Sequence, residues 1–165
     1  GSASTADLSE KALTQAVEAA VNIAKYTSVD KCSGLADKEL LAMHALDLDL
    51  YHPKELSTLQ AIDIAKECEQ SALSFDERIT NSDGANLDCF SGFKVYGNSH
   101  GQIVGYPSSR YSLSCVLIAS ENGGMQRDYA YTVDRVFEEM DAASVVGNKA
   151  AKAAIENAGG TAETL

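Results

Sequence analysis

Positive charge is scarce in this chain of 165 residues. It carries 13 Lys and Arg against 24 Asp and Glu, which gives a formal net charge of −11 and an isoelectric point near 4.6. A groove for a nucleic-acid backbone requires clustered Lys and Arg, and anionic membranes attract basic surfaces. We therefore expect neither direct nucleic-acid binding nor a membrane partner.

Paired cysteines and long apolar runs are missing as well. Cys32, Cys68, Cys89 and Cys115 are widely spaced and form no Cys-x-x-Cys motif. No apolar run reaches the ~18 residues of a membrane-spanning helix, and no secretory hydrophobic region is seen. Reduced thiols in a cytoplasmic protein are the simplest interpretation, with Cys68 and Cys115 packed in the core.

Common catalytic motifs are also absent. The sequence has no Gly-x-x-x-x-Gly-Lys or Gly-x-Gly-x-x-Gly phosphate loop, no Gly-x-Ser-x-Gly elbow and no His-Glu-x-x-His zinc pair. We therefore assign no catalytic, cofactor-binding or metal-binding residue to this chain.

Weaker patterns of His and Asp between residues 44 and 52 leave a metal site as an alternative. His44 and His52 flank Asp47 and Asp49, and together they would supply ligands for a mixed metal site. Asp47-Leu48-Asp49 also resembles the Asp-x-Asp pair that holds a divalent ion in nucleotide-sugar chemistry. An exposed acidic loop is the simpler interpretation of these residues.

Two further patterns have structural explanations. Ser99 and His100 bring a hydroxyl next to an imidazole, but adjacent side chains on a strand point apart, which disfavours a Ser/His hydrolase. Five tyrosines with two arginines would stack nucleobases, although tyrosine is first of all a strand former. These residues are Tyr96, Tyr106, Tyr111, Tyr129, Tyr131, Arg110 and Arg127.

Alternating apolar residues and turn residues predict an antiparallel sheet. Three strands joined by two turns are expected from residue 93 to residue 135, and Tyr111, Leu113, Cys115 and Leu117 fall on one face. In detail, we expect a strand at 78–80, a turn at 81–84, and strands at 85–89, 93–96, 102–106 leading through 107–109 into 111–120, and 126–133.

Helices are predicted on both sides of these strands. Ser9 is expected to cap a helix that ends at Tyr26, and Ser57 with Gln60 forms a capping box for a second helix. Asp141 is expected to cap a third helix. Its small side chains are Ala142, Val146, Ala150, Ala153 and Ala154.

The order of these elements predicts one α+β segment over residues 1–165. Its antiparallel, curved sheet is expected to carry helices on one face. Residues 27–56 are predicted to connect the first two helices, with a short helix at 37–43.

Blocks of the predicted sheet resemble the PmbA branch of the TldD/PmbA family. The strongest are Gly-Asn-Ser-His-Gly at 97–101, the stretch from Gly-Tyr at 105–106 to Ser-Ser-Arg-Tyr-Ser-Leu-Ser at 108–114, and Met-Gln-Arg-Asp-Tyr-Ala-Tyr at 125–131. Supporting stretches lie at 26–28, 36–42, 46–53 and 78–81, so the resemblance covers nearly the whole chain. It implies an internal segment of a longer protein, without the family's C-terminal domain.

The resemblance also implies a function. In this family a TldD-type subunit carries zinc on a His-Glu-x-x-x-His helix outside the present segment, and the PmbA-type subunit pairs with it. Together they act in the cytoplasm as a metallopeptidase on unfolded or modified peptides, including the maturation of a peptide antibiotic. A proposed link to DNA gyrase would be indirect for so acidic a chain.

A contact surface is expected at exposed strand edges near residues 97–101 and 122–124, which could take up an extended peptide by β-augmentation. The isolated chain is also expected to form a homodimer. The alternatives are a hydrolase active when full length and a free-standing adaptor domain. The residues assigned to peptide or partner contact are Asn98, Ser99, His100, Tyr106, Arg110, Arg127 and Tyr129.

Overall fold

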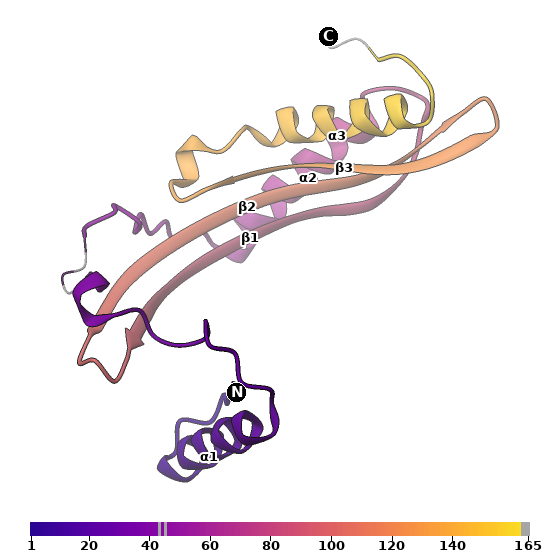
Figure 1. The fold of residues 1–165 in the computed structure, drawn as a ribbon. Helices are drawn as coiled ribbons and strands as arrows, with labels where there is room; N and C mark the ends of the chain where they lie inside the picture. The colour runs from indigo at the N-terminus through magenta and orange to yellow at the C-terminus, as the bar shows by residue number, and fades with distance from the viewer. Residues whose placement is uncertain (43, 45, 163–165) are drawn as a thin grey trace. The chain divides into compact units, whose positions relative to one another are not determined.

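The fold was obtained as a computed structural model that describes residues 1–42, 44 and 46–162 (Figure 1). Its contacts divide the chain into two compact units, Gly1–Leu41 and Ala42–Leu165. Within the described ranges, every helix is too short or too polar to cross a lipid bilayer.

The first unit contains helix α1 (Glu10–Tyr26) and the short 3-10 helix η1 (Lys38–Leu40). The Ser9 hydroxyl accepts a hydrogen bond from the amide of Ala12, which confirms the predicted cap. The helix predicted at 37–43 is shorter than expected because the backbone is already extended at Leu41. Met43, the last residue of that prediction, lies outside the described residues.

The second unit is a three-stranded antiparallel sheet with two long helices. Its strands are β1 (Ile79–Gly97), β2 (Ile103–Glu121) and β3 (Gly124–Asp134), in the order β1-β2-β3. The helices are α2 (Thr58–Leu73) and α3 (Ala143–Asn157), and a short 3-10 helix, η2 (Phe137–Glu139), follows β3. The α+β class and the three strands with two turns are confirmed.

The core lies between one face of the sheet and the two long helices. Leu113, Cys115 and Leu117 of β2 are buried there, as their alternation predicts. From the helices come Cys68 and Ala72 of α2 and a row of buried, mostly small residues of α3. That row is Ala143, Val146, Gly147, Ala150, Ala151, Ala154 and Ile155.

Two local predictions for the strands are wrong. Residues 81–84 form no turn but lie inside β1, where the register with β2 shifts on either side of Ser82. Gly84 takes a φ of 104° there, so the chain bulges and continues in the same direction. Residues 90–92 likewise continue β1 between the predicted strands 85–89 and 93–96, whereas residues 107–109 continue β2 as predicted, with Pro107 opposite Phe93.

The predicted cap of the third helix is wrong as well. Ala142 occupies the N-cap position of α3 and makes no side-chain cap. The Asp141 carboxylate instead forms an ion pair with Lys149, 2.7 Å away, so it is not available to the first turn. The Ser57 and Gln60 capping box of α2 is present as predicted.

Candidate functional site

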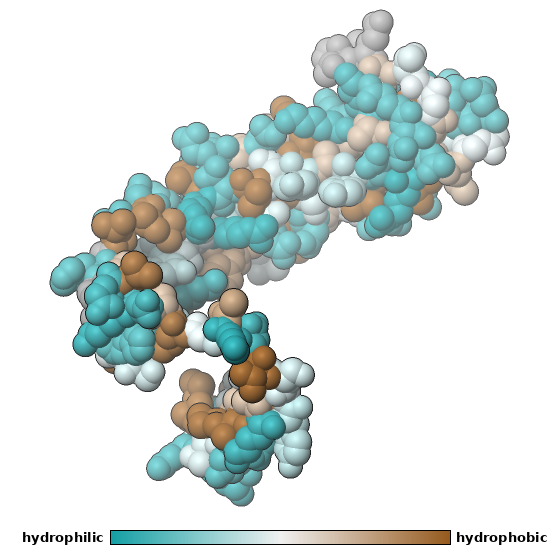
Figure 2. Space-filling model, in the orientation of Figure 1, coloured by the Kyte–Doolittle hydropathy of each residue, from teal (hydrophilic) through white to brown (hydrophobic). Residues whose placement is uncertain are grey.

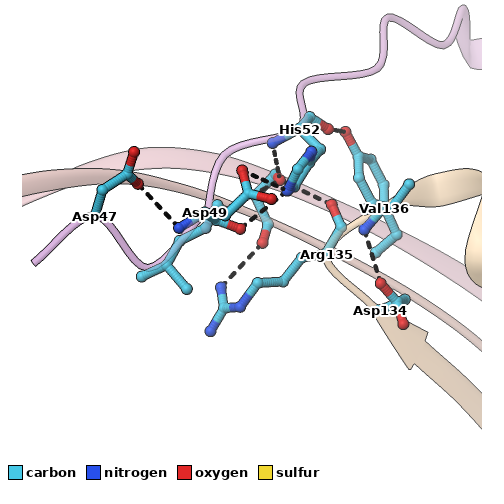
Figure 3. Close-up of polar contacts among 9 residues, drawn as sticks. Asp47, Asp49, His52, Asp134, Arg135 and Val136 are labelled. Atoms are coloured by element: carbon cyan, nitrogen blue, oxygen red, sulfur yellow. Dashed lines mark hydrogen bonds and ion pairs between the residues drawn. The ribbon is translucent and has the colours of Figure 1, made fainter.

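The segment that precedes α2 lies along β2 beyond the end of β3 (Figure 3). The last residue of β3, Asp134, is paired with Tyr111 of β2. Further along β2, the amide of Ser109 donates to the carbonyl oxygen of Leu50 at 2.9 Å. The connecting segment therefore takes the place that a longer third strand would occupy. Pro107 is accommodated here because its missing N–H falls on this side of β2 and not on the side paired with β1.

Ser109 is the centre of this junction. Its side chain is fully buried, and its hydroxyl accepts a hydrogen bond from the amide of His52 at 2.8 Å. The same hydroxyl donates to the carbonyl oxygen of Arg135 at 2.9 Å. One buried hydroxyl thus joins β2 to the connecting segment and to the chain that leaves β3.

Tyr111 makes the neighbouring connection. Its hydroxyl donates to the His52 carbonyl at 2.9 Å and accepts from the Lys54 amide at 2.6 Å. Its ring lies edge-on to Phe137, with centroids 5.5 Å apart. The Lys54 ammonium also pairs with Glu138, and this hydrogen bond holds the pKa of the Glu138 carboxyl below its usual value.

An open cleft of about 560 Å³ lies beside the junction. The Nε2 atom of His52 is 2.9 Å from the Asp49 carbonyl oxygen and 3.4 Å from its carboxylate. The Asp134 carboxylate accepts the amide of Val136, so it is already engaged. The lining residues are Asp49, His52, Arg110, Val133, Asp134, Arg135 and Val136.

The arrangement of these groups can be compared with the requirements of a metal centre. Zinc requires three or four nitrogen, sulfur or oxygen ligands around one point. In residues 1–42, 44 and 46–162, no group of three His, Cys, Asp or Glu is arranged to hold a metal ion. The described residues therefore do not fit a zinc site, and His52 contacts Asp49 alone among the acidic residues weighed for one.

The predicted contact residues divide into two groups, and the first is the β1–β2 turn. The Asn98 side-chain oxygen accepts the amides of His100 at 3.0 Å and Gln102 at 3.4 Å. Gly101 supplies the positive φ, 85°. Ser99 is exposed, and Nδ1 of His100 is buried with no hydrogen-bond partner among the described residues.

The second group lies on the outer face of the sheet, away from α2 and α3. Alternation places Tyr106, Arg110, Arg127 and Tyr129 there, and the ring of Tyr129 stacks on Tyr131 with centroids 6.2 Å apart. Arg127 pairs with Ile118 of β2, eight residues from Arg110, which is roughly 26 Å along the strand. One small ligand therefore cannot reach both arginines.

Sequence reasoning missed the junction at Ser109 and Tyr111. Ser109 was given no role beyond its place in the strand, and Tyr111 was treated only as a core residue and possible stacking partner. The available signal was a polar hydroxyl at each of two positions on the apolar face of one strand. A buried hydroxyl must find hydrogen-bond partners, and these came from residues 50–54, nearly sixty positions earlier in the sequence.

Comparison with known proteins places this fold in a family. Residues 51–158 match the family model described as the PmbA/TldA metallopeptidase central domain. Metalloprotease PmbA of Escherichia coli O157:H7 is 52% identical over 152 residues, which are 92% of this chain and 34% of that protein. The Metalloprotease PmbA homolog of Haemophilus influenzae is 51% identical over the same length, with the same coverage.

A solved structure is also similar to this chain. The crystal structure of a protein from Bacteroides thetaiotaomicron described as a modulator of DNA gyrase superposes with a TM-score of 0.71. It is 26% identical and covers 88% of this chain and 34% of its own. The chain thus spans about a third of the length of the relatives it matches. It belongs to the PmbA/TldD metallopeptidase family, in the PmbA branch.

Proposed function

We propose that this chain is a supporting segment of a PmbA-type subunit, which pairs with a TldD-type zinc metallopeptidase in the cytoplasm. The observation that carries the proposal is the 52% identity to Metalloprotease PmbA over nearly the whole chain. The pair would cleave unfolded or modified peptides, as in peptide-antibiotic maturation. Zinc and the bond-breaking groups would belong to the TldD-type partner.

The charge of the chain supports an indirect role in any process that involves DNA gyrase. A net charge of −11 opposes binding to a phosphate backbone. Proteolysis of a regulator would connect such a peptidase to gyrase without DNA contact. The gyrase description of the Bacteroides relative is compatible with this route.

Peptide contact is proposed at the strand edges and at the cleft beside His52. An extended peptide would add its backbone to an open strand edge, while Arg110 and Arg135 would meet its carboxylates. The Asp128 carboxylate accepts the amide of Tyr129 at 2.8 Å, so part of the β3 edge is already blocked. The edge of β1 near the β1–β2 turn is therefore preferred.

Pairing is tested by mixing the chain with a TldD-type subunit and measuring the mass of the eluted species by light scattering. We expect one complex at micromolar concentrations, because the supporting role requires a stable contact. A full-length PmbA-type protein is the positive control, since it contains any contacts that lie outside these residues. Separate elution of the chain and the subunit would contradict a partner role for this segment.

The names of the relatives favour a second candidate, a peptidase active in its own right when full length. Elemental analysis and peptide-cleavage assays of the full-length protein alone distinguish the two. Stoichiometric zinc in that protein, or turnover that is lost on His100→Ala, would support the second candidate. Activity that appears only with the TldD-type subunit would support the first.

A further inference from the structure

Two of the four cysteines meet in the core of the second unit. Cys68 belongs to α2 and Cys115 to the central strand β2, and both are fully buried in the same apolar cluster. The surface drawn in Figure 2 is largely hydrophilic, and neither thiol has exposed area on it or on any other face. Both thiols are free, whereas the other two cysteines, Cys32 and Cys89, are free and exposed.

The two buried thiols contact each other directly. The Cys68 thiol donates a hydrogen bond to the Cys115 sulfur, and this bond is the main reason why the pKa of Cys68 is raised. Burial adds to the increase, as do the nearby carboxylates of Glu67 and Glu69. The same hydrogen bond lowers the pKa of Cys115, although burial and Glu69 oppose it. Cys115 is therefore the thiol that ionises first, and Cys68 stays protonated beside it.

The pair lies beneath the edge strand β1, at the point where that strand is irregular. Cys115 is paired with Ala85, which is only partly buried, and the register of β1 shifts on either side of Ser82. The Ser82 hydroxyl donates to the Glu69 carboxylate at 2.7 Å, so α2 is attached at the same place. A bulge disrupts the ladder of hydrogen bonds, and an edge strand opens locally at a lower cost than the whole fold. A small molecule can therefore reach the pair without global unfolding.

We propose that hydrogen peroxide converts Cys68 and Cys115 into a disulfide that crosslinks α2 to β2. The Cys115 thiolate attacks one peroxide oxygen, and the O–O bond breaks to give a sulfenic acid and hydroxide, which takes up the proton that Cys115 lost. The Cys68 sulfur then attacks the sulfenic sulfur, the S–O bond breaks, and a second water leaves with the Cys68 proton. Two thiols thus lose two electrons, and one peroxide is reduced to two waters.

The crosslink has a consequence for stability. Positions 68 and 115 are far apart in the sequence, so the disulfide removes conformational entropy mainly from the unfolded chain. We therefore expect oxidation to raise the urea midpoint of the chain, and reduction with dithiothreitol to restore the original value. This inference does not depend on the proposed peptidase pairing.

The test uses the chain with Cys32→Ser and Cys89→Ser, which removes the exposed thiols and keeps the buried pair. After treatment with hydrogen peroxide, the chain is unfolded in iodoacetamide, and neither remaining cysteine should be alkylated. Trypsin places the two cysteines in separate peptides, 67–78 and 111–127. Mass spectrometry should find these peptides joined, with a mass that is lower by two hydrogen atoms than the sum of the two.

Further variants distinguish the pair from general oxidation. Cys68→Ala, added to the same background, leaves Cys115 without a second thiol, so peroxide should neither join the peptides nor raise the urea midpoint. Cys115→Ala should have the same effect because it removes the thiol that attacks peroxide. Circular dichroism verifies that both variants fold. The peptide mapping needs neither of them, so it decides the proposal even where one does not fold.

Three outcomes would overturn the proposal. The first is alkylation of both cysteines after peroxide treatment. The second is a sulfinic acid at Cys115 with Cys68 still a free thiol, since the two sulfurs would then not react with each other. The third is a crosslink that forms only when peroxide is added to the chain in urea, because the folded chain would then not bring the two thiols together.

Discussion

At the scale of single residues, Gly147 decides how closely α2 and α3 approach. A Cβ atom at this position would lie 2.2 Å from the backbone oxygen of Cys68 and 3.1 Å from the amide nitrogen of Ala72. Both are backbone atoms of helix α2 at its two buried residues, so neither can move aside as a side-chain tip would. Position 147 therefore requires glycine because the residue has no side chain between the two helices, and not because its backbone is flexible.

Gly147→Ala is therefore expected to destabilise the fold by about 1–3 kcal/mol, the usual cost of overpacking. In an exposed helix the same change would stabilise by about 1 kcal/mol, so the direction of the effect identifies the cause. Urea unfolding, followed by circular dichroism, measures the change in the free energy of unfolding. Gly97→Ala is the control, because its nearest atoms lie 3.8 Å from the added Cβ. Equal midpoints for the two variants would contradict the close helix contact.

Asp76 and Arg78 form a second residue-scale contact between the end of α2 and the start of β1. The Arg78 guanidinium donates to both carboxylate oxygens of Asp76, at 2.8 Å and 2.7 Å, and the Arg78 amide also donates to it. The guanidinium hydrogen bonds, followed by the backbone amide, lower the pKa of Asp76 from 3.8 to about 2.

This lowered pKa predicts a loss of stability in acid. A carboxyl whose pKa is lower in the folded chain than in the unfolded chain stabilises the fold above the unfolded value of 3.8. That contribution disappears as the pH falls from about 4 toward 2. The difference in urea midpoint between the wild type and Asp76→Asn should therefore shrink across this window. Asp63→Asn, on the exposed side of α2, controls for the change in net charge. A difference in urea midpoint between the wild type and Asp76→Asn that stays constant with pH would contradict the ion pair.

At the scale of elements, hydrogen bonds from distant parts of the chain hold the connecting segment on β2. Ser109 and Tyr111 supply the side chains, and Leu50, His52 and Lys54 supply the backbone groups. Local sequence explains little of this, since turn residues and one proline predict only an irregular connection. By contrast α1 and α2 follow from local signals, namely their N-caps and periodic apolar residues.

Tyr111→Phe tests this attachment. The change keeps the ring against Phe137 but leaves the His52 carbonyl and the Lys54 amide without their partner. We expect a loss of about 1–3 kcal/mol and faster hydrogen exchange at the Lys54 amide. Tyr131→Phe is the control, because that ring is 58% exposed on the outer face. Unchanged exchange at Lys54 would show that the hydroxyl does not hold the segment.

At the scale of the whole molecule, the buried core belongs to the second unit. The core residues come from α2, α3 and the sheet, whereas α1 buries no residue. An isolated helix of this length is only marginally stable in water. Helix α1 would therefore need apolar contacts along one side to be stable. Apolar side chains of α1 are exposed in the described residues, among them Val17 at 64% and Val21 at 49%.

Sequence alone determined the class of fold, because apolar periods of two and of about 3.6 residues distinguish strands from helices. It also determined the acidic character of the chain and, through blocks such as residues 97–101, the family. Tertiary structure decided which apparent turns became bulges, where the connecting segment lies and which apolar residues stay exposed. Those outcomes depend on partners distant in sequence, such as Leu50 for Ser109 and Cys68 for Gly147, and a local pattern contains no information about them.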